Sequence, residues 1–358
     1  MNGADTWTPN SPCDTHCLPH RRTLPRATFA CRLRRVLAVA VLLLYGVLLA
    51  SAMPVLSESL RRTAARTWFT GVLAALGVRL RVRGVPPSRA GEGAGALVVS
   101  NHVSWLDVLA LQAVCPMRLL AKAEVRDWPL LGMLAVRAGT LFIDRNRPSG
   151  LPAAIGSVTE ALRHGYVVGA FPEGTTRCGR ASGRYRPAVF QAALDAGAPV
   201  RPVALRYELA SGEPTTVAAF LGEDTLLGSL REVLAVRGLV VELIPLPSPR
   251  ATATASPVRF DRGRDSVALG ASASDPGRPG ISGYAAVRRD NPAARRELAS
   301  YCARVVTEAC EPRPAGNHWT CTAVEVAASC GDRSERPPRN DRRDGPGARE
   351  STVGTAVP

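Results

Sequence analysis

The sequence predicts an α/β fold, a mixed sheet flanked by helices, with an N-terminal two-helix motif that anchors the chain to a membrane. Three observations predict it. Short apolar runs alternate with amphipathic segments between residues 78 and 245, an uncharged segment precedes them, and a basic amphipathic segment links the two. With 358 residues, 46% of them apolar, the chain can form one large domain with tails, or two domains.

The N-terminal part of the sequence is polar at first and then strongly apolar. Residues 1–35 are polar and basic, which predicts a disordered tail. The next 18 residues, Val36–Met53, carry no charge, and Pro54 follows them. They admit three interpretations: a signal peptide with Ala50-Ser51-Ala52 as its cleavage site, a membrane span near the lower limit of about 20 residues, or a helix that anchors without crossing.

The segment Leu56–Leu80 is expected to be a basic amphipathic helix, with Arg61, Arg62 and Arg66 on its polar side. Residues 1–90 carry 13 arginines against three acidic residues. An apolar helix, a proline break and a basic helix together are typical of attachment to an anionic membrane surface. We therefore expect residues 36–80 to be membrane-associated, the alternative being an ordinary buried helix pair.

The strand Val78–Val82, in which apolar residues alternate with arginines, resembles a sheet edge and leads into a domain over residues 81–247. Uniformly apolar runs such as ALVVS predict strands buried on both faces. Further strands are expected at Ala96–Ser100, Arg118–Ala121, Thr140–Ile143, Val167–Phe171, Val200–Leu205 and Leu239–Leu243. Helices are expected at Ser104–Val114, Pro129–Arg137, Leu151–His164, Pro187–Ala196 and Thr225–Val236.

Three segments follow the domain. Residues 248–291 are rich in Ala, Thr, Ser, Pro and Gly, which predicts a flexible insert. Residues 292–310 have helical periodicity and are expected to form a helix that packs on the domain. The Arg-, Asp- and Pro-rich residues 311–358 are expected to be a disordered tail.

The formal net charge of +15 indicates an anionic partner: nucleic acid, a membrane surface or an acidic substrate. Lys122 is the only lysine, and this arginine-rich composition is typical of a GC-rich genome. The chain has no interleaved basic and aromatic residues and no recognised nucleic-acid module. We therefore expect no nucleic-acid partner.

The nine cysteines form no paired framework, which favours a reducing, cytosol-facing location. Cys13, His16, Cys17 and His20 are metal-binding residue types close together in the tail. Their spacing matches no standard zinc module, so we predict no metal site.

A polar group directly follows the strand Ala96–Ser100, in the motif NHVSWLD. Ligands bind at the carboxyl ends of strands in α/β sheets. His102 and Asp107 can pair there only if His102 lies just outside the following helix. The carboxylate would then accept Nδ1–H and raise the basicity of Nε2. The spacing alone is equally compatible with a helix-capping histidine and a solvent-facing aspartate.

Three more motifs lie at or near expected strands. GTLFIDR brings Asp144 and Arg145 to the edge of the sheet, and FPEGTTR offers backbone N–H groups, hydroxyls and an arginine suited to a phosphate. By itself, FPEGTTR is also compatible with a simple tight turn. APVRPVALRY places Pro202 inside a strand, which favours an edge or a bulge.

With these four motifs in order, the chain resembles the glycerolipid acyltransferases, the family that includes 1-acylglycerol-3-phosphate acyltransferase. The resemblance implies that His102 is the general base for the hydroxyl of a lysophospholipid and that Asp107 orients it and stabilises its charge. The hydroxyl would attack the thioester of acyl-CoA or acyl-carrier protein. The sequence has no Gly-x-Ser-x-Gly elbow and no His-Glu-x-x-His motif, which favours direct transfer without a metal or other cofactor.

The resemblance also implies an acceptor-phosphate site, and Lys122 could be a further contact or a plain surface lysine. Tyr185-Arg186-Pro187 departs from the Phe-Lys-x-Gly-like run of many members, which bears on the head group. By position, the residues of the phosphate site are Arg145, Glu173, Gly174, Thr175, Thr176 and Arg177.

The expected reaction makes phosphatidic acid from 1-acyl-sn-glycerol-3-phosphate, on the cytoplasmic face of the cell membrane. A lysolipid acceptor lies in the bilayer and the thioester donor in the cytosol, which argues against a cleaved signal peptide. Two alternatives stay open: another lysolipid acceptor, such as a lyso-ornithine lipid, and a non-catalytic lipid-binding protein.

Overall fold

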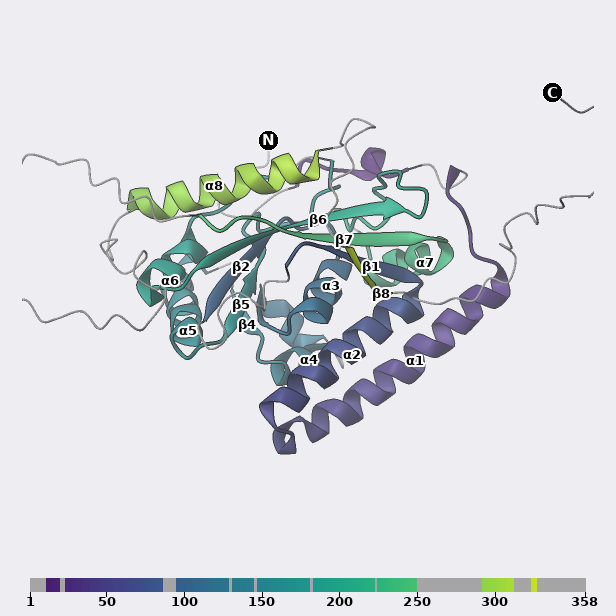
Figure 1. Cartoon of the computed structure of the whole chain (residues 1–358), viewed down its shortest axis with the longest axis horizontal. Coiled ribbons are helices and arrows are strands. Elements are labelled where there is room, and N and C mark those ends of the chain that lie inside the picture. The colour runs from purple at the N-terminus through teal and green to yellow at the C-terminus, as the bar shows by residue number, and fades with distance from the viewer. Residues whose placement is uncertain are drawn as a thin grey trace, which may run out of the picture. The chain divides into compact units, whose positions relative to one another are not determined.

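The computed structural model describes residues 11–19, 23–85, 95–128, 131–144, 147–180, 183–222, 224–249, 292–311 and 323–326. The strands are β1 Val78–Arg83, β2 Ala96–Ser100, β3 Arg118–Lys122, β4 Leu141–Ile143, β5 Val167–Ala170, β6 Val200–Leu209, β7 Leu239–Pro245 and β8 Ala323–Val326. They form a sheet of order β4-β3-β5-β2-β6-β7-β1-β8 (Figure 1). Neighbours are parallel from β4 to β6 and between β7 and β1, and antiparallel at β6–β7 and β1–β8. The predicted mixed sheet is confirmed.

The helices that flank the sheet also match the predicted fold class. The α-helices are α1 Phe29–Ala52, α2 Glu58–Leu76, α3 Leu106–Val114, α4 Leu131–Arg137, α5 Leu151–Arg163, α6 Ala188–Ala196, α7 Leu226–Ala235 and α8 Pro292–Cys310. Short 3-10 helices are η1 Thr15–Cys17, η3 Met53–Val55, η5 Ala123–Asp127 and η6 Pro148–Gly150.

Helices cover both faces of the sheet. One core contains side chains of α2, α3 and α7, and the other contains side chains of α5, α6 and α8. Strand β2 lies between them: Val98 belongs to the first core, whereas Leu97 and Val99 belong to the second. Successive side chains of a strand point to opposite faces, so an all-apolar β2 serves both cores.

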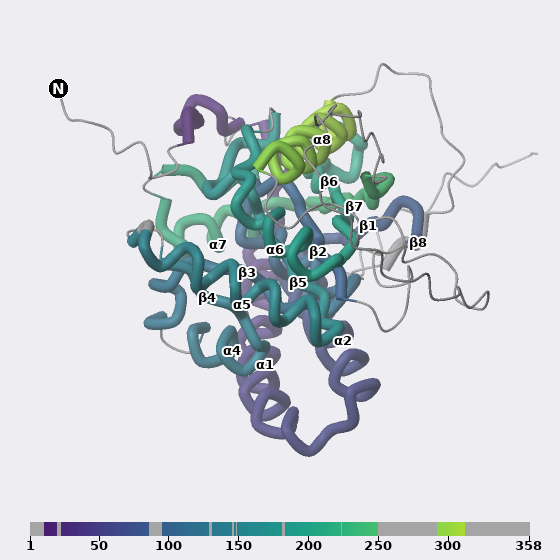
Figure 2. Tube along the Cα trace, turned by 90° about the vertical axis from the view of Figure 1, so that its left-hand side faces the viewer, coloured from purple at the N-terminus to yellow at the C-terminus, as the bar shows by residue number. Residues whose placement is uncertain are grey.

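Helices α1 and α2 lie side by side (Figure 1, Figure 2). Thr28 caps α1, where its hydroxyl accepts the N–H of Cys31 at 3.4 Å. Gly46 lets the indole of Trp68 approach closely, since a Cβ atom at Gly46 would lie 2.5 Å from that ring. The indole N–H of Trp68 donates to the carbonyl of Leu42 at 2.8 Å. A missing side chain on one helix therefore makes room for the largest side chain of the other.

Arg35 fixes α1 to the body of the domain. Its buried guanidinium donates to the carbonyls of Leu234 and Val236 at 2.9 and 2.7 Å, at the end of α7. Gly77, in the left-handed conformation with φ of 78°, ends α2 and leaves the space that this guanidinium fills.

Among the residues that the structure describes, one helix, Phe29–Val55, is long and apolar enough to cross a membrane; its mean hydropathy is 2.6, and 6% of its most apolar stretch is buried. This measure rests on length and composition alone. Large apolar side chains are exposed along α1, among them Leu33, Leu37, Val41, Leu44 and Leu48.

The N-terminal boundary differs from the expected tail over residues 1–35, because α1 begins at Phe29 rather than at Val36. The preceding residues pack on the domain: the N–H of Ala27 donates to Ala235 at 2.9 Å, and the N–H of Arg237 donates to Pro25 at 2.8 Å. These partners are remote in the sequence, so local composition did not reveal them.

The expected edge position of Val78–Val82 needs correction. Strand β1 lies between β7 and β8, and β8 falls within residues 311–358, which were expected to be disordered. The expected insert at 248–291 and most of that tail lie outside the described residues.

Pro202 needs a second correction, because it lies in a strand with neighbours on both sides. It is in register with Val99 of β2, and the ladder between β6 and β7 begins only at the next residue, Val203. The Pro202 carbonyl accepts from Leu246 at 2.9 Å, so its nitrogen also faces the β7 side, just beyond the ladder. The missing N–H therefore leaves the pairing with β2 intact and removes only the reciprocal bond to Leu246 at the end of the β6–β7 pairing.

Candidate active site

The loop between β2 and α3 brings His102 and Asp107 together. Helix α3 begins at Leu106, so Asp107 lies in its first turn and His102 in the loop before it. His102 Nδ1 is 2.9 Å from Asp107 Oδ2. The carboxylate is fully buried, whereas the imidazole keeps 21% of its surface exposed. The buried carboxyl group of Asp107 thus faces a partly exposed imidazole.

Asp107 has further donors besides the imidazole. Its Oδ2 accepts the backbone N–H groups of Val103 and Ser104 at 2.7 and 2.9 Å, and its Oδ1 accepts the hydroxyl of Tyr207 at 2.5 Å. A buried carboxylate needs such donors to stay ionised. Burial, with the adjacent Asp107 charge, raises the pKa of Tyr207 well above its ordinary value, so its hydroxyl remains a donor. Tyr207 was not predicted from the sequence.

His102 is held on its other sides by neighbouring strand ends. Its ring stacks on Phe171 at a centroid distance of 4.0 Å and an interplanar angle of 12°. Its carbonyl accepts the N–H of Arg177 at 2.8 Å. Asn101, one residue earlier, exchanges two hydrogen bonds of 2.9 Å with the backbone of Leu205 in β6. The imidazole is therefore fixed to β2, β5 and β6 together.

A cleft of about 1560 Å³ opens beside the imidazole. Helices α1 and α2 form one of its walls, and α3 and α4 contribute others. Among the polar residues that line it are His102, Lys122 and Arg201. Its apolar lining includes Trp68, Phe69, Val72, Trp105, Leu109 and Leu134.

The residues of FPEGTTR divide into two groups. Gly174, Thr175 and Thr176 line the cleft. Glu173 is buried instead, where its carboxylate accepts the N–H of Gly183 at 2.8 Å and lies 3.7 Å from Arg177 Nε. Glu173 and Arg177 border a smaller hollow with Asn101 and Cys310 rather than the cleft. In this structure they shape the turn that presents the other three.

The other residues predicted to bind the acceptor phosphate are Lys122, which lies on the cleft, and Arg145, which lies outside the described residues. Lys122 ends β3 and is exposed. Asp144, the neighbour of Arg145, is 3.7 Å from the guanidinium of Arg147.

Arg201 is a cation of the cleft that sequence reasoning missed as a site residue, although it belongs to the RPVAL motif. It is 9% exposed, and burial lowers its pKa below the ordinary value despite the neighbouring Cys115. Its position in β6, next to β2, places it in the same cleft as His102.

Comparisons with known proteins identify the family of the chain. The acyltransferase family model matches residues 79–206, which contain the dyad and FPEGTTR. A lyso-ornithine lipid O-acyltransferase of Pseudomonas aeruginosa is 42% identical over 193 residues, which cover 53% of this chain and 72% of the relative. The chain belongs to the glycerolipid acyltransferase family. Within this family, its reaction class is acyl transfer to a lysolipid.

Other members of the glycerolipid acyltransferase family are similar in sequence or fold. The 1-acyl-sn-glycerol-3-phosphate acyltransferase of Neisseria meningitidis is 41% identical over 191 residues, or 53% of this chain and 73% of the relative. The crystal structure of the 1-acyl-sn-glycerophosphate acyltransferase PlsC of Thermotoga maritima superposes with a TM-score of 0.52 at 15% identity. It covers 78% of this chain and 93% of PlsC, and at this identity it bears on the fold alone.

Proposed function

We propose that the protein transfers a fatty acyl group from acyl-CoA or acyl-carrier protein to the free hydroxyl of 1-acyl-sn-glycerol-3-phosphate, giving phosphatidic acid. The observation that carries the proposal is the dyad of His102 and buried Asp107 beside a large, mainly apolar cleft. Such a cleft suits lipid chains, and the dyad suits removal of a hydroxyl proton.

The chemistry follows from the hydrogen bonds of the dyad. Asp107 accepts Nδ1–H of His102, which leaves the Nε2 lone pair for the acceptor hydroxyl. As Nε2 takes the proton, the oxygen attacks the thioester carbonyl carbon and forms a tetrahedral intermediate. The intermediate collapses with breakage of the C–S bond, and the leaving thiolate takes the proton back from the imidazolium. Asp107 stabilises the imidazolium without itself being protonated.

The acceptor phosphate is proposed to bind along the polar side of the cleft. Gly174, Thr175 and Thr176 line it there, and Lys122 and Arg201 provide positive charge. Hydroxyl groups, backbone N–H groups and cations are the usual partners of a phosphate. Arg145, Glu173 and Arg177 remain proposed acceptor residues on the ground of the family resemblance.

Membrane attachment through α1 and α2 supports a lipid acceptor. Exposed apolar side chains along α1 suit the acyl region of a bilayer, and the arginines of residues 1–90 suit an anionic surface. The proposed location is the cell membrane with the domain on its cytoplasmic face, where the thioester donors are.

A lyso-ornithine lipid is the second candidate acceptor. The relative named lyso-ornithine lipid O-acyltransferase is 42% identical, close to the 41% of the relative named for 1-acyl-sn-glycerol-3-phosphate. An acceptor panel with acyl-CoA and acyl-carrier protein as donors, read by mass spectrometry, separates the two. Phosphatidic acid as the fastest product supports the first proposal, and ornithine lipid as the fastest product supports the second.

The His102→Ala variant tests the mechanism. Loss of a positioned general base costs about 10²–10⁴-fold in rate, so we expect acyl transfer to fall by that factor. The matched control is His164→Ala, since His164 is exposed at the end of α5, bonded to the carbonyl of Glu160. Both variants should keep the circular dichroism of the wild type. Undiminished transfer by folded His102→Ala protein would refute the proposed base.

A further inference from the structure

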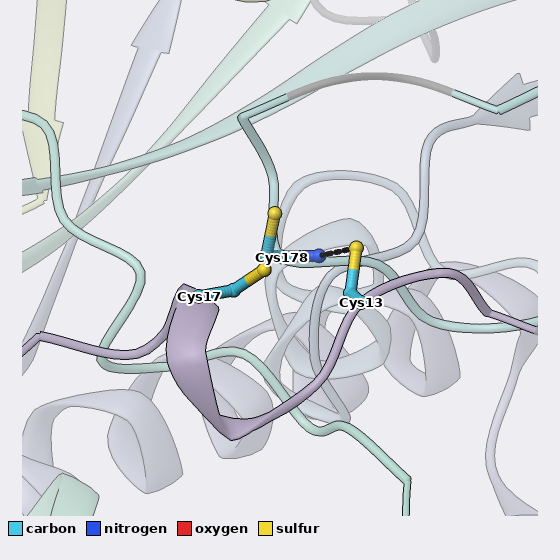
Figure 3. Close-up of side chains that lie close together, drawn as sticks. All are labelled: Cys13, Cys17 and Cys178. Carbon is cyan, nitrogen blue, oxygen red and sulfur yellow. Dashed lines mark hydrogen bonds between the residues drawn. The ribbon is translucent and has the colours of Figure 1, made fainter.

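Three cysteine sulfurs converge beside the active-site loop. Cys13 and Cys17 come from the N-terminal segment around η1, and Cys178 comes from the loop after β5 (Figure 3). The three sulfurs lie within 4.8 Å of one another, with Cys178 buried and the other two partly buried. All three are free thiols rather than disulfide partners. Cys13 also lines the cleft that contains His102.

The arrangement fits a thiolate metal site. Zn²⁺ binds thiolates at about 2.3 Å, so sulfurs on one tetrahedral ion lie about 3.8 Å apart. Small rotations of the three side chains would bring the sulfurs to that separation. The N–H of Cys178 already donates to Cys13 Sγ at 3.4 Å.

We propose that Cys13, Cys17 and Cys178 bind a soft divalent metal ion of the zinc class. Thiolates select such ions over the hard ions that carboxylates prefer. Within the described part of the chain, these three residues form the whole donor set. A fourth ligand would come from solvent.

The ion would fasten the N-terminal segment to the loop after β5, which in turn contacts the loop that carries His102. Cys178 follows Arg177, whose N–H binds the carbonyl of His102. On the other side of the site, the hydroxyl of Thr216 donates to the carbonyl of Cys17 at 2.7 Å. The proposed ion therefore joins the segment before α1 to the loop after β5, whose Arg177 bonds to the backbone of His102. Because an ion that binds only the folded chain stabilises it, this site would contribute to stability.

Metal content is the direct test. The full chain, purified in reductant and stripped with chelator, is incubated with Zn²⁺ or Co²⁺, desalted and measured by plasma mass spectrometry. We expect one ion per chain, a thiolate-to-cobalt charge-transfer absorption, and a higher unfolding temperature with the ion. Cys13→Ser/Cys17→Ser and Cys178→Ser should lose all three effects. The control Cys31→Ser, on α1 and outside the cluster, should keep them.

Three results would overturn the proposal: no stoichiometric ion in the wild type, equal ion in the cluster variants, or a Cys13–Cys17 disulfide in protein whose thiols were blocked at lysis. If Cys178→Ser fails to fold, Cys17→Ser in the N-terminal segment carries the test, and undiminished binding there would count against the site. Acyl transfer measured on the same samples keeps this inference separate from the proposed function. Loss of the ion with His102-dependent transfer retained would leave that function standing.

Discussion

At the scale of single residues, the chemistry depends on how Asp107 is held. Two of its donors, Val103 and Ser104, belong to its own turn, so the sequence NHVSWLD encodes them locally. The hydroxyl of Tyr207 reaches the same carboxylate from β6. Local spacing could therefore predict a pairing of His102 with Asp107, but it could not predict the tyrosine. Only the formation of the sheet brings β6 alongside β2.

Tyr207→Phe should slow the reaction without weakening substrate binding. The variant leaves Asp107 Oδ1 without its hydroxyl donor, so the carboxylate orients the imidazole less firmly. We expect the rate constant at saturation to fall about tenfold, equivalent to about 1.4 kcal/mol, with both Michaelis constants unchanged.

The control for Tyr207→Phe is Tyr301→Phe, because Tyr301 lies on α8 and its hydroxyl donates to the carbonyl of Pro247 at 3.3 Å, away from the dyad. It should leave the rate constant at its wild-type value. A fall in rate caused only by higher Michaelis constants would contradict a positioning role for Tyr207.

At the scale of helices and strands, periodicity predicted the central elements closely because they fill two cores. Strand β2 was predicted at its observed bounds, since four of its five residues form the uninterrupted apolar run that is typical of a parallel strand buried on both faces. Helix α1 was predicted to start too late, because its first two turns carry three arginines, one of which is the buried Arg35. A charge that is buried against remote carbonyls is indistinguishable in sequence from one in solvent. Cys13 and Cys17 were noted in the sequence as metal-binding residue types, but their convergence with Cys178 was missed, because Cys178 comes from a distant loop.

The crossing of α1 and α2 should be sensitive to side-chain volume at Gly46. Gly46→Leu would push the new side chain into the indole of Trp68 and break its bond to Leu42. Overpacking of this kind costs about 1–3 kcal/mol. Thermal unfolding in detergent should show a lower midpoint.

Gly71→Ala on the facing helix is the matched control. A Cβ atom there meets only Leu42, at 3.7 Å, which is ordinary van der Waals contact. Because alanine favours a helix over glycine by up to about 1 kcal/mol, the midpoint should stay or rise. Equal midpoints for Gly46→Leu and the wild type would show that this crossing is loosely packed.

At the scale of the whole molecule, the apolar helix α1 forms part of the wall of a large cleft. Helix α1 exposes its apolar side chains on one side and contributes Leu43, Gly46 and Leu49 to the cleft on the other. Composition predicted an apolar helix followed by arginines, since an uncharged run and the arginines after it are patterns along the chain. The cleft was not predicted, because its walls come from α1, α2, α3 and α4 together.

Replacement of Leu37, Val41 and Leu44 by asparagine should release the protein from membranes. Each large apolar side chain contributes about 1.5–3 kcal/mol when it leaves water, so binding should weaken by at least about 100-fold. Flotation with vesicles that contain phosphatidylglycerol measures it. The control is Leu227→Asn, an exposed leucine on α7. Triple-variant protein that floats as well as the wild type would exclude α1 as the anchor.

Lys122 gives the chain an unusual chemical profile. Thioesters acylate free amines without a catalyst, whereas a protonated guanidinium is a very poor nucleophile. All other basic side chains apart from the histidines are arginines, and the single ε-amino group lines the cleft that also contains His102, where the proposed reaction brings the thioester to the acceptor. Accidental self-modification of a side-chain amine would therefore be confined to one position, and a mass increase in the peptide that carries Lys122 would record how often the donor occupies the site.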